Sequence, residues 1–462
     1  MSATRGWKIA TRAVVLIACL ASRTASRADD PPPAPVVPAP NAAPAVPSPV
    51  LPAPSADPED PTIEFGVPPL PISTDVNSTY VPGEGVTISL LNDTSRLRLS
   101  ASLSALMIFN TQRPFTSGAP FLLLPASPFG LSTNTFDLHA RQSSIFAAFE
   151  GPEVRGLTPR ATILTFFFND NLVADNYGLL VYFAYGELMN ERMRLAGGLM
   201  QDVYNPVSPT VLSLAKLYGS GNTGSYRGML RLERYLELSR NSMFTMQAAI
   251  SEPTSTLVTG DLSRINEDDG IPNFESRIAL ALGQKGEKGP ANGRPFEVGL
   301  SGVVGRLRTT RTILVPPDSR PPRVVDDVWG FGVDMRWAVT DRFGLASEFY
   351  LGQSLGEYNG TILQNNNSTT LGPIRGRGGF GELYFYLTEK LHWHVGYGID
   401  APFVRDLAPT QFARNQTLFN TLVWDVTSNF QVGFEVDYRK TNYIQFLDNE
   451  GVSFLTQFLW KF

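Results

Sequence analysis

The sequence predicts an all-β protein, a closed antiparallel transmembrane β-barrel of about 16 strands with short turns at one end and long loops at the other. From residue 96 onward, segments of about ten residues alternate apolar and polar side chains, which is the pattern of strands that separate lipid from water. No later stretch approaches the ~18 apolar residues of a membrane helix. The chain ends in an aromatic-rich segment, VSFLTQFLWKF (452–462).

The first 28 residues have the features of a secretory signal peptide. A basic start (Arg5 to Arg12) precedes a short apolar stretch (13–20), and SRA (26–28) has the small-x-small pattern of a cleavage site. The only cysteine, Cys19, ends the segment LIAC, which also resembles a bacterial lipoprotein signal. Lipidation of Cys19 therefore stays open, and either route exports the chain.

Residues 29–71 are expected to form a Pro/Ala-rich periplasmic linker. Between residues 31 and 71 lie 16 prolines, mostly separated by alanine and valine. Such a composition favours extended polyproline conformations and cannot build a packed core. The linker is a spacer or, alternatively, a segment that crosses or binds the cell wall. Residues 72–95 are a transition segment, and we expect the barrel to occupy 96–462.

Composition excludes several classes of protein. The net charge is −5, and the chain beyond residue 28 carries 33 basic and 43 acidic residues, so it lacks the basic face that nucleic acids require. One cysteine excludes an intramolecular disulfide framework and a cysteine-based zinc site. No Ser/His/Asp set is tied to a strand-end motif, so the sequence supports neither an enzyme nor a cofactor.

The alternation assigns two faces to each strand. In the first strand, leucine and alanine occupy one face from Leu97 to Ala105, and arginine and serine occupy the other. A soluble β-sandwich also alternates, but here the polar face carries full charges and the apolar face carries aromatics at its ends. We therefore expect the polar faces to line a lumen. The tryptophans expected to form interfacial girdles are Trp329, Trp337, Trp393, Trp424 and Trp460.

Three short turns of related sequence fix the direction of the strands. They are VTDRF (339–343), LTEKL (387–391) and VTSNF (426–430), and each is a tight polar hairpin. Other connections are longer, such as 253–272 and 354–376, and short periplasmic turns with long outer loops are the outer-membrane arrangement. Counting from the turns predicts strands near 96–109, 136–150, 160–168, 178–188, 192–200, 225–237, 243–252, 273–283, 295–305, 326–339, 343–353, 378–388, 391–400, 413–426, 429–440 and 451–462.

The final strand resembles that of bacterial porins, which carries alternating aromatics, ends in Phe and is read by the barrel-assembly machinery. Phe458, Trp460 and Phe462 match this assembly signal, and Thr456 departs from it. More narrowly, the chain resembles the DcaP-like trimeric porins in FAYGEL followed by RMRLAGGLMQDVYNPV, and in RNQTLFNTLVWDV followed by FQVGFEVDYRKTNY. The resemblance covers 96–462 and leaves out the proline-rich segment.

The resemblance implies an outer-membrane location among outer-membrane lipids, a homotrimer, and passive diffusion of small hydrophilic solutes. In porins the third outer loop folds into the lumen. Counting turns independently makes the third outer loop 201–224. Its apolar residues (Val211, Leu212, Leu214 and Leu217) are poorly suited to water, which also favours a loop packed inside the barrel.

Charged residues on the inferred inward faces form the candidate site. We expect the pore to be lined by Arg141, Arg192, Arg194, Arg227, Arg231, Asp202 and Glu233. In one hypothesis the five arginines form a basic ladder facing acids such as Asp202, which would orient and pass anionic or zwitterionic solutes. In the other, the arginines pair with Glu187, Glu233 and Glu275 and keep the lumen wet.

Three further motifs are interpreted as structural. His392 and His394 share one face of a strand, but the sequence names no further metal ligand, which favours a polar lumen pair. GRGGFG (376–381) matches G-x-G-x-x-G but precedes a strand rather than a helix, so we interpret it as loop and bulge glycines. The acidic segment NEDDG (266–270) lacks the spacing of a calcium-binding loop and is expected to be a solvated outer loop.

Three functions follow from these patterns. The first is a porin that passes small hydrophilic solutes. The second is a structural or adhesive outer-membrane barrel, tethered to the envelope through its proline-rich segment. The third is a secreted soluble β-protein. Conductance in planar bilayers distinguishes the first from the second, and detergent dependence with heat-modifiable gel migration distinguishes both from the third.

Overall fold

The computed structural model describes residues 83–90, 94–131, 133–168, 177–254, 264–267, 270–284, 294–311 and 323–462. The expected signal peptide, the linker, most of the transition segment and part of the acidic segment 266–270 lie outside the described residues. Every described residue belongs to the compact unit Ile63–Phe462.

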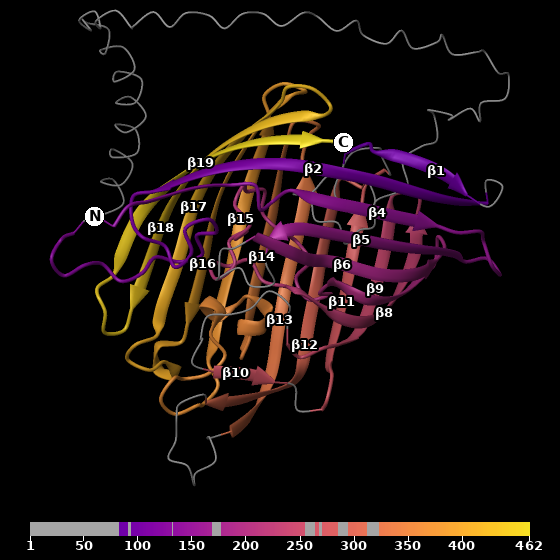
Figure 1. The fold of residues 1–462 in the computed structure, drawn as a ribbon. Helices are drawn as coiled ribbons and strands as arrows, with labels where there is room; N and C mark the ends of the chain where they lie inside the picture. Colours follow the sequence, from indigo (N-terminus) through magenta and orange to yellow (C-terminus); the bar gives the residue numbers. More distant parts are fainter. Residues whose placement is uncertain are drawn as a thin grey trace, which may run out of the picture. The chain divides into compact units, whose positions relative to one another are not determined.

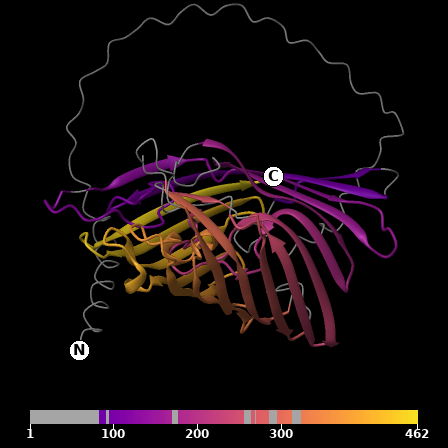
Figure 2. The same ribbon diagram turned by 90° about the horizontal axis from the view of Figure 1, so that it is seen from below.

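One antiparallel sheet closes on itself to form a barrel (Figures 1 and 2). Sixteen strands of the described chain form the ring, because the last strand pairs with the first. They are β2 (Ser95–Asn110), β4 (Ser144–Glu150), β5 (Thr158–Phe168), β6 (Tyr177–Met189), β7 (Met193–Gln201), β8 (Tyr226–Ser239), β9 (Ser242–Ser251), β11 (Asn273–Leu282), β12 (Phe296–Arg311), β13 (Arg323–Ala338), β14 (Phe343–Gln353), β15 (Arg375–Tyr386), β16 (Leu391–Pro402), β17 (Phe412–Asp425), β18 (Phe430–Tyr443) and β19 (Asn449–Lys461). The predicted 16-stranded closed antiparallel barrel is confirmed.

Three short strands extend this ring. β3 (Thr135–His139) and β4 pair with successive parts of β2, so the strand predicted over 136–150 is present but interrupted at 140–143. β10 (Arg264–Glu267) pairs with the end of β12, inside the connection predicted over 253–272. β1 (Val86–Leu90) pairs with the start of β2, so strand structure begins before the expected boundary at 96.

Helical structure in the described residues is limited to three short turns of 3₁₀ helix. They are η1 (Gly356–Tyr358), η2 (Thr361–Leu363) and η3 (Val404–Asp406). In the described part of the chain, no helix has the length and apolar character needed to cross a membrane.

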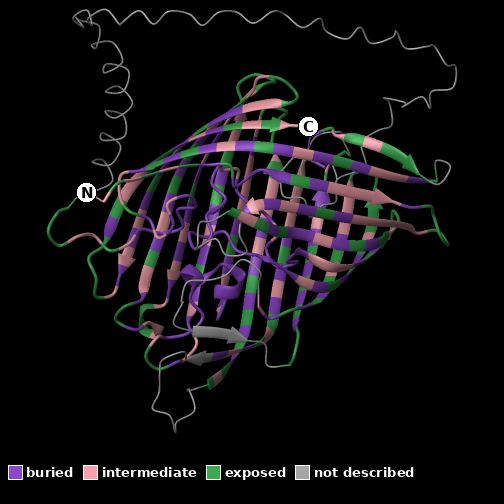
Figure 3. Cartoon of the chain, in the orientation of Figure 1, coloured by how far each residue is buried: buried purple, intermediate pink, exposed green. Residues whose placement is uncertain are grey.

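Burial along the strands is inverted relative to a soluble sheet. In β2, Ser100, Ser102 and Ser104 are buried, whereas Leu99 and Leu103 are 42% and 53% exposed. The same alternation of buried and exposed residues continues around the ring (Figure 3). Apolar side chains that point outward and polar ones that point inward suit a closed barrel in hydrocarbon. The predicted assignment of the two faces is therefore correct.

The three short turns share one hydrogen-bonding pattern. The hydroxyl of Thr340 accepts the backbone N–H groups of Arg342 and Phe343. Thr388 occupies the same position in LTEKL, and Thr427 accepts one such N–H in VTSNF. A threonine hydroxyl that replaces a backbone acceptor stabilises a tight turn. The repeated threonine thus explains why the chain reverses at these points, which lie at what we call the short-turn end.

Aromatic side chains gather on the outer face beside the short turns. The ring centroids of Phe343 and Phe385 are 4.8 Å apart, and those of Phe385 and Trp393 are 5.5 Å apart. Phe430 lies 5.1 Å from Trp460 in the same way. Amphipathic rings prefer a membrane–water boundary, so this cluster fits the aromatic girdle expected at one end of the barrel.

The end of the chain completes the closure. Phe454, Phe458, Trp460 and Phe462 are 40–54% exposed on the outward face, as predicted. The backbone N–H of Phe462 donates to the Ala101 carbonyl at 2.8 Å. Beyond this point β1 occupies the same edge of β2, with Val86 opposite Leu99. β1 therefore continues the line of β19 past the C-terminal residue.

Candidate functional site

The third loop at the long-loop end, which we call L3 (202–225), lies inside the barrel. All of its residues except Pro206, Thr210 and Val211 are buried. L3 contacts inward-facing side chains from strands on several sides of the ring. This confirms the prediction, made by counting turns, that 201–224 packs inside the barrel.

Four inward-facing glutamates hold the backbone of L3, and we call them the wall glutamates: Glu275, Glu348, Glu382 and Glu435. Their carboxylates accept the backbone N–H groups of Val203 at 2.8 Å, Thr223 at 2.8 Å, Thr210 at 2.7 Å and Leu212 at 2.6 Å, respectively. All four are buried, on β11, β14, β15 and β18. A buried loop must satisfy its backbone donors, and these side-chain acceptors do so at separate points of the wall.

Leu212 lies in a hydrophobic pocket on the inner wall. Its side chain packs with Leu106, Ile108, Val423 and Leu455, which are apolar residues on inward faces. Its carbonyl accepts a hydrogen bond from the Gln142 side chain at 2.9 Å. Its N–H also donates to Glu435, so L3 is held against β2, β17, β18 and β19 by packing and by hydrogen bonds to β18 and to the segment 140–143.

Inward-facing glycines leave room for L3. A Cβ added at Gly398 would lie 2.1 Å from the Ser220 carbonyl oxygen, and one at Gly332 would lie 1.9 Å from the Asn205 side-chain oxygen. Real Cβ atoms do not approach so closely, so the loop depends on these missing side chains. Gly376 and Gly378 lie within β15, which corrects their interpretation as loop and bulge glycines.

A second inward loop, L6 (354–374), packs against L3. Its η1 and η2 residues are buried. The Ile362 N–H donates to the Asp400 carboxylate of β16 at 3.0 Å, and the Gly224 N–H of L3 donates to the Tyr358 carbonyl at 2.9 Å. The first loop also turns inward, since Phe121 and Leu123 are buried. The first, third and sixth loops thus all place buried residues inside the ring.

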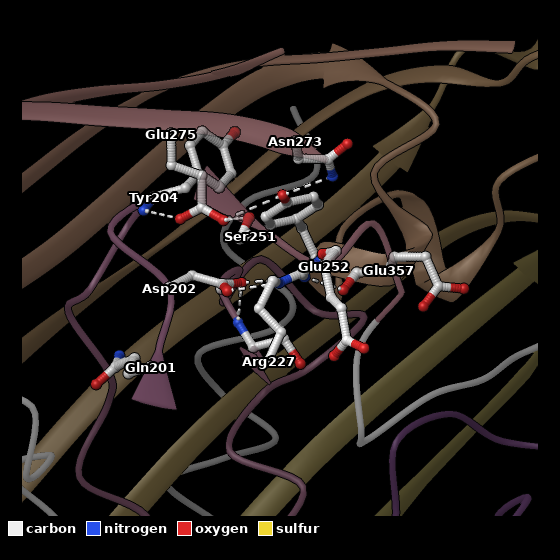
Figure 4. Close-up of polar contacts among 12 residues, drawn as sticks. Gln201, Asp202, Tyr204, Arg227, Ser251, Glu252, Asn273, Glu275 and Glu357 are labelled. Atoms are coloured by element: carbon white, nitrogen blue, oxygen red, sulfur yellow. Dashed lines mark hydrogen bonds and ion pairs between the residues drawn. The ribbon is translucent and has the colours of Figure 1, made fainter. Parts of the chain in front are cut away.

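Arg227 and Asp202, two of the predicted pore residues, form a buried ion pair with several further partners (Figure 4). Arg227 Nε lies 2.6 Å from Asp202 Oδ1, and both side chains are fully buried. The guanidinium also donates to the carbonyls of Glu252, Pro253 and Glu357 at 2.8–3.0 Å. It lies 3.8 Å from the centre of the Tyr358 ring. This cluster joins β8, L3 and L6.

The other predicted pore residues are distributed as follows. Arg194 contacts Glu187 and Glu233, and Arg231 contacts Glu233 at 2.7 Å, all buried on the inward face. Arg141 pairs with Asp137 in the interruption between β3 and β4. Arg192 does not lie on the inward face. It is exposed in the turn before β7, because its backbone N–H is held by the Asn190 side chain.

L3 also carries a buried lysine. The Lys216 ammonium donates to the Tyr182 hydroxyl at 3.0 Å and lies 5.2 Å from the centre of that ring. Burial lowers the pKa of Lys216 to about 7. Its environment is the aromatic cluster of Tyr182, Tyr218 and Tyr226, where charge is poorly solvated.

Ion pairs continue around the short-turn half of the inward wall. Arg277 contacts Glu297 at 2.8 Å and Asp334 at 2.6 Å. Arg160 Nε donates to Glu150 at 2.8 Å. Each of these arginines has at least one carboxylate partner, as do Arg194 and Arg231. The arginines named here are therefore paired with acids of the same wall.

Sequence reasoning missed the wall glutamates as a group. Alternation along each strand placed Glu275 and Glu435 on inward faces, but it could not show that L3 would meet them. Among the described residues, no three His, Cys, Asp or Glu side chains are arranged to hold one metal ion. The signal that was available is the recurrence of single glutamates in otherwise small or apolar inward faces, as in Gly344–Gly352 of β14.

The closed ring of sixteen strands, the inverted burial and the inward third loop define the fold of outer-membrane channels of the porin type. The barrel is similar to the outer membrane channel DcaP of Acinetobacter baumannii, with a TM-score of 0.60 and 10% sequence identity, over 82% of this chain and 100% of that one. It is also similar to the in-vitro folded OmpT of Vibrio cholerae in its trimer form, with a TM-score of 0.50 and 9% identity, over 80% of this chain and 99% of that one. No protein-family model and no curated protein matches the sequence.

Proposed function

We propose that the protein is an outer-membrane porin, a water-filled channel for passive diffusion of small hydrophilic solutes. The observation that carries this proposal is the inverted burial of the ring, with charged side chains inside and leucine, phenylalanine and tryptophan outside. A closed barrel with this surface is stable in hydrocarbon and encloses polar surface that water can wet. L3, held by the wall glutamates, determines the diameter of the pore.

Purified protein in planar bilayers tests the proposal. The expected result is stable, open channels that report discrete conductance steps in salt solution. An absence of conductance from correctly folded, heat-modifiable protein would contradict it. That outcome would support the alternative of a structural or adhesive barrel, which the extensive burial of L3 and L6 favours.

For the charge of the solute, the pairing of the inward arginines with acids favours a channel without a strong preference for anions. The contacts of Arg194 and Arg231 fit the hypothesis in which the arginines pair with acids on the wall. Arg227 faces Asp202 of L3, as the basic-ladder hypothesis requires, but the two are in direct contact and so leave little field for a solute. A strong preference for anions in the measured ion selectivity would support the basic-ladder hypothesis instead.

Replacement of Arg194 by alanine is expected to shift ion selectivity toward cations. The change leaves Glu187 and Glu233 without the guanidinium that lies between them, so the wall gains negative charge. The reversal potential across a salt gradient measures the shift. The matched control is Arg306→Ala, which removes an exposed arginine that pairs with Asp327 at 3.5 Å. An equal reversal potential in both variants would show that Arg194 does not face the permeating ions.

We also propose that three copies assemble, since a solved barrel of similar fold forms a trimer. The outward face offers exposed apolar residues for contact with lipid or with a neighbouring copy, including Phe331, Phe349 and Phe434. Conductance steps in multiples of three, and a trimer by cross-linking in detergent, are the expected results. Residues 1–28 as a signal peptide and 29–71 as a periplasmic linker remain parts of the proposal.

Deletion of Phe462 is expected to lower the yield of folded barrel. Its backbone forms hydrogen bonds with Ala101 at 2.8 and 3.3 Å where the ring closes, and each such bond contributes about 1 kcal/mol. The same residue, with Phe458 and Trp460, is our proposed signal for the assembly machinery. The fraction of protein that migrates as a folded, heat-modifiable band measures the effect. Phe462→Tyr, which keeps both the backbone and the ring, should assemble normally, and equal yields for the deletion would count against both roles.

A further inference from the structure

A pair of histidines lies on the inner wall near the short-turn end. His392 and His394 occupy alternate positions of β16 and face inward. Nδ1 of His392 and Nε2 of His394 are 2.7 Å apart, and the two rings are nearly perpendicular, at 83°. The sequence predicts a polar pair at this place, and the four ring nitrogens all have close partners.

Each ring presents its other nitrogen to a carboxylate. Nδ1 of His394 lies 2.6 Å from Oε1 of Glu382, and Nε2 of His392 lies 3.5 Å from Oδ2 of Asp425. A carboxylate can only accept a hydrogen bond, so the short contact to Glu382 places the ring hydrogen of His394 on Nδ1, and the longer ion pair with Asp425 favours a hydrogen on Nε2 of His392. Imidazoles that bind metal ions are commonly oriented by carboxylates in this way.

The inner nitrogens are then left with lone pairs. In neutral rings whose hydrogens are on the outer nitrogens, Nδ1 of His392 and Nε2 of His394 are both acceptors. Two acceptors at 2.7 Å repel each other unless a cation lies between them. That cation is either a proton or a metal ion. The two carboxylates behind the rings favour positive charge at this position.

We propose that His392 and His394, with Glu382 and Asp425 as their outer partners, form a binding site for a borderline divalent cation such as Zn²⁺ or Cu²⁺. Imidazole nitrogen suits these ions better than Ca²⁺ or Mg²⁺. A tetrahedral ion bound at ~2.0–2.1 Å sets its two nitrogens roughly 3.3 Å apart, so the pair needs to open by only about 0.6 Å. No third protein ligand is arranged for one ion in the described chain, so water completes the coordination.

The site is reachable and is connected to L3. The Asp425 side chain is 37% exposed and that of His392 is 12% exposed, whereas His394 and Glu382 lie deeper. Glu382 uses its second oxygen, Oε2, to accept the Thr210 N–H of L3 at 2.7 Å. An ion bound to the histidines therefore strengthens the orientation of one of the glutamates that hold L3.

Copper binding to the detergent-solubilised, folded full chain tests the proposal without depending on conductance. Millimolar Ca²⁺ is included to occupy oxygen-ligand sites, and Cu²⁺ is titrated while its electron paramagnetic resonance spectrum is recorded. We expect one Cu²⁺ per chain with two nitrogen ligands. His392→Gln and His394→Gln should each weaken binding at least tenfold, and Glu382→Gln should weaken it by roughly 10–100-fold, as for other outer partners.

The third histidine provides a matched control. His139→Gln removes a buried histidine distant from this site in the sequence and should leave the copper spectrum and affinity unchanged. Circular dichroism and heat-modifiable migration establish that each variant is folded. Copper binding that survives in the His392→Gln, His394→Gln double variant would overturn the proposal. So would the absence of binding at micromolar Cu²⁺, which would show that a proton lies between the rings.

Discussion

Replacement of Arg227 by methionine is expected to destabilise the barrel by about 3–5 kcal/mol, the cost of leaving one member of a buried ion pair without its partner. Asp202 would remain fully buried without the guanidinium that contacts it at 2.6 Å. Three carbonyl acceptors, on Glu252 and Pro253 after β9 and on Glu357 of L6, would also lose a donor. The thermal midpoint for loss of the folded band measures the change.

A double substitution provides the internal control. The double variant Asp202→Asn, Arg227→Met removes the Asp202 carboxylate together with the Arg227 guanidinium, so no unpaired charge stays buried. We therefore expect the double variant to be more stable than Arg227→Met alone, with a coupling of ~1 kcal/mol or more. A single variant that loses less than ~1 kcal/mol would mean that water reaches Asp202 and that the cluster does not hold L3.

Removal of Glu348 and Glu435 together is expected to release part of L3 and to raise the single-channel conductance. The N–H groups of Thr223 and Leu212 would lose their acceptors on β14 and β18. Each hydrogen bond contributes about 1 kcal/mol or more, so the ratio of seated to displaced loop should fall by roughly 5–30-fold. Larger and noisier current steps from Glu348→Ala, Glu435→Ala protein would show this.

Glu297→Ala is the control for that experiment. Glu297 also faces inward, but it pairs with Arg277 on the wall at 2.8 Å and is not among the four wall glutamates. Its loss should change selectivity more than conductance. If the Glu348→Ala, Glu435→Ala variant conducted like the native channel while Glu297→Ala did not, L3 would not determine the pore diameter. Proteolysis of L3 from the long-loop side offers a second readout, because a displaced loop is cleaved faster.

Strand positions and the inward third loop could be predicted because both depend on local pattern. Side chains in a strand alternate with a period of two, so residues such as Ser100 and Leu103 reveal their faces without knowledge of their neighbours. Turn chemistry added the direction, since the hydroxyl of Thr340 and its equivalents stabilise the short reversals. The apolar residues of L3 are poorly suited to water, which predicted that the loop is buried inside the barrel. Leu212 is buried there as predicted.

The partners of the inward residues could not be predicted, because they depend on where loops cross the ring. Alternation placed Glu435 inward but gave no means to pair it with Leu212, more than two hundred residues earlier. It also suggested an inward Arg192, since one residue more or less at a turn changes the face. The pairing of Arg194 with both Glu187 and Glu233 needed the register of β6, β7 and β8.

The position of β1 has a mechanical consequence. Everything ahead of Gly83 is joined to the ring through β1, whose pairing with β2 starts at Val86 opposite Leu99 and ends at Leu90 opposite Ser95. Tension on the N-terminal segment would act first on the Val86–Leu99 pair. The remaining pairs between β1 and β2 would then break one after another toward Leu90. The stretch from Val86 to Ser95 could extend to about 30 Å before any force reached the ring. β19 closes the ring against a different part of β2. The barrel would therefore stay intact while the pairing of β1 with β2 was lost.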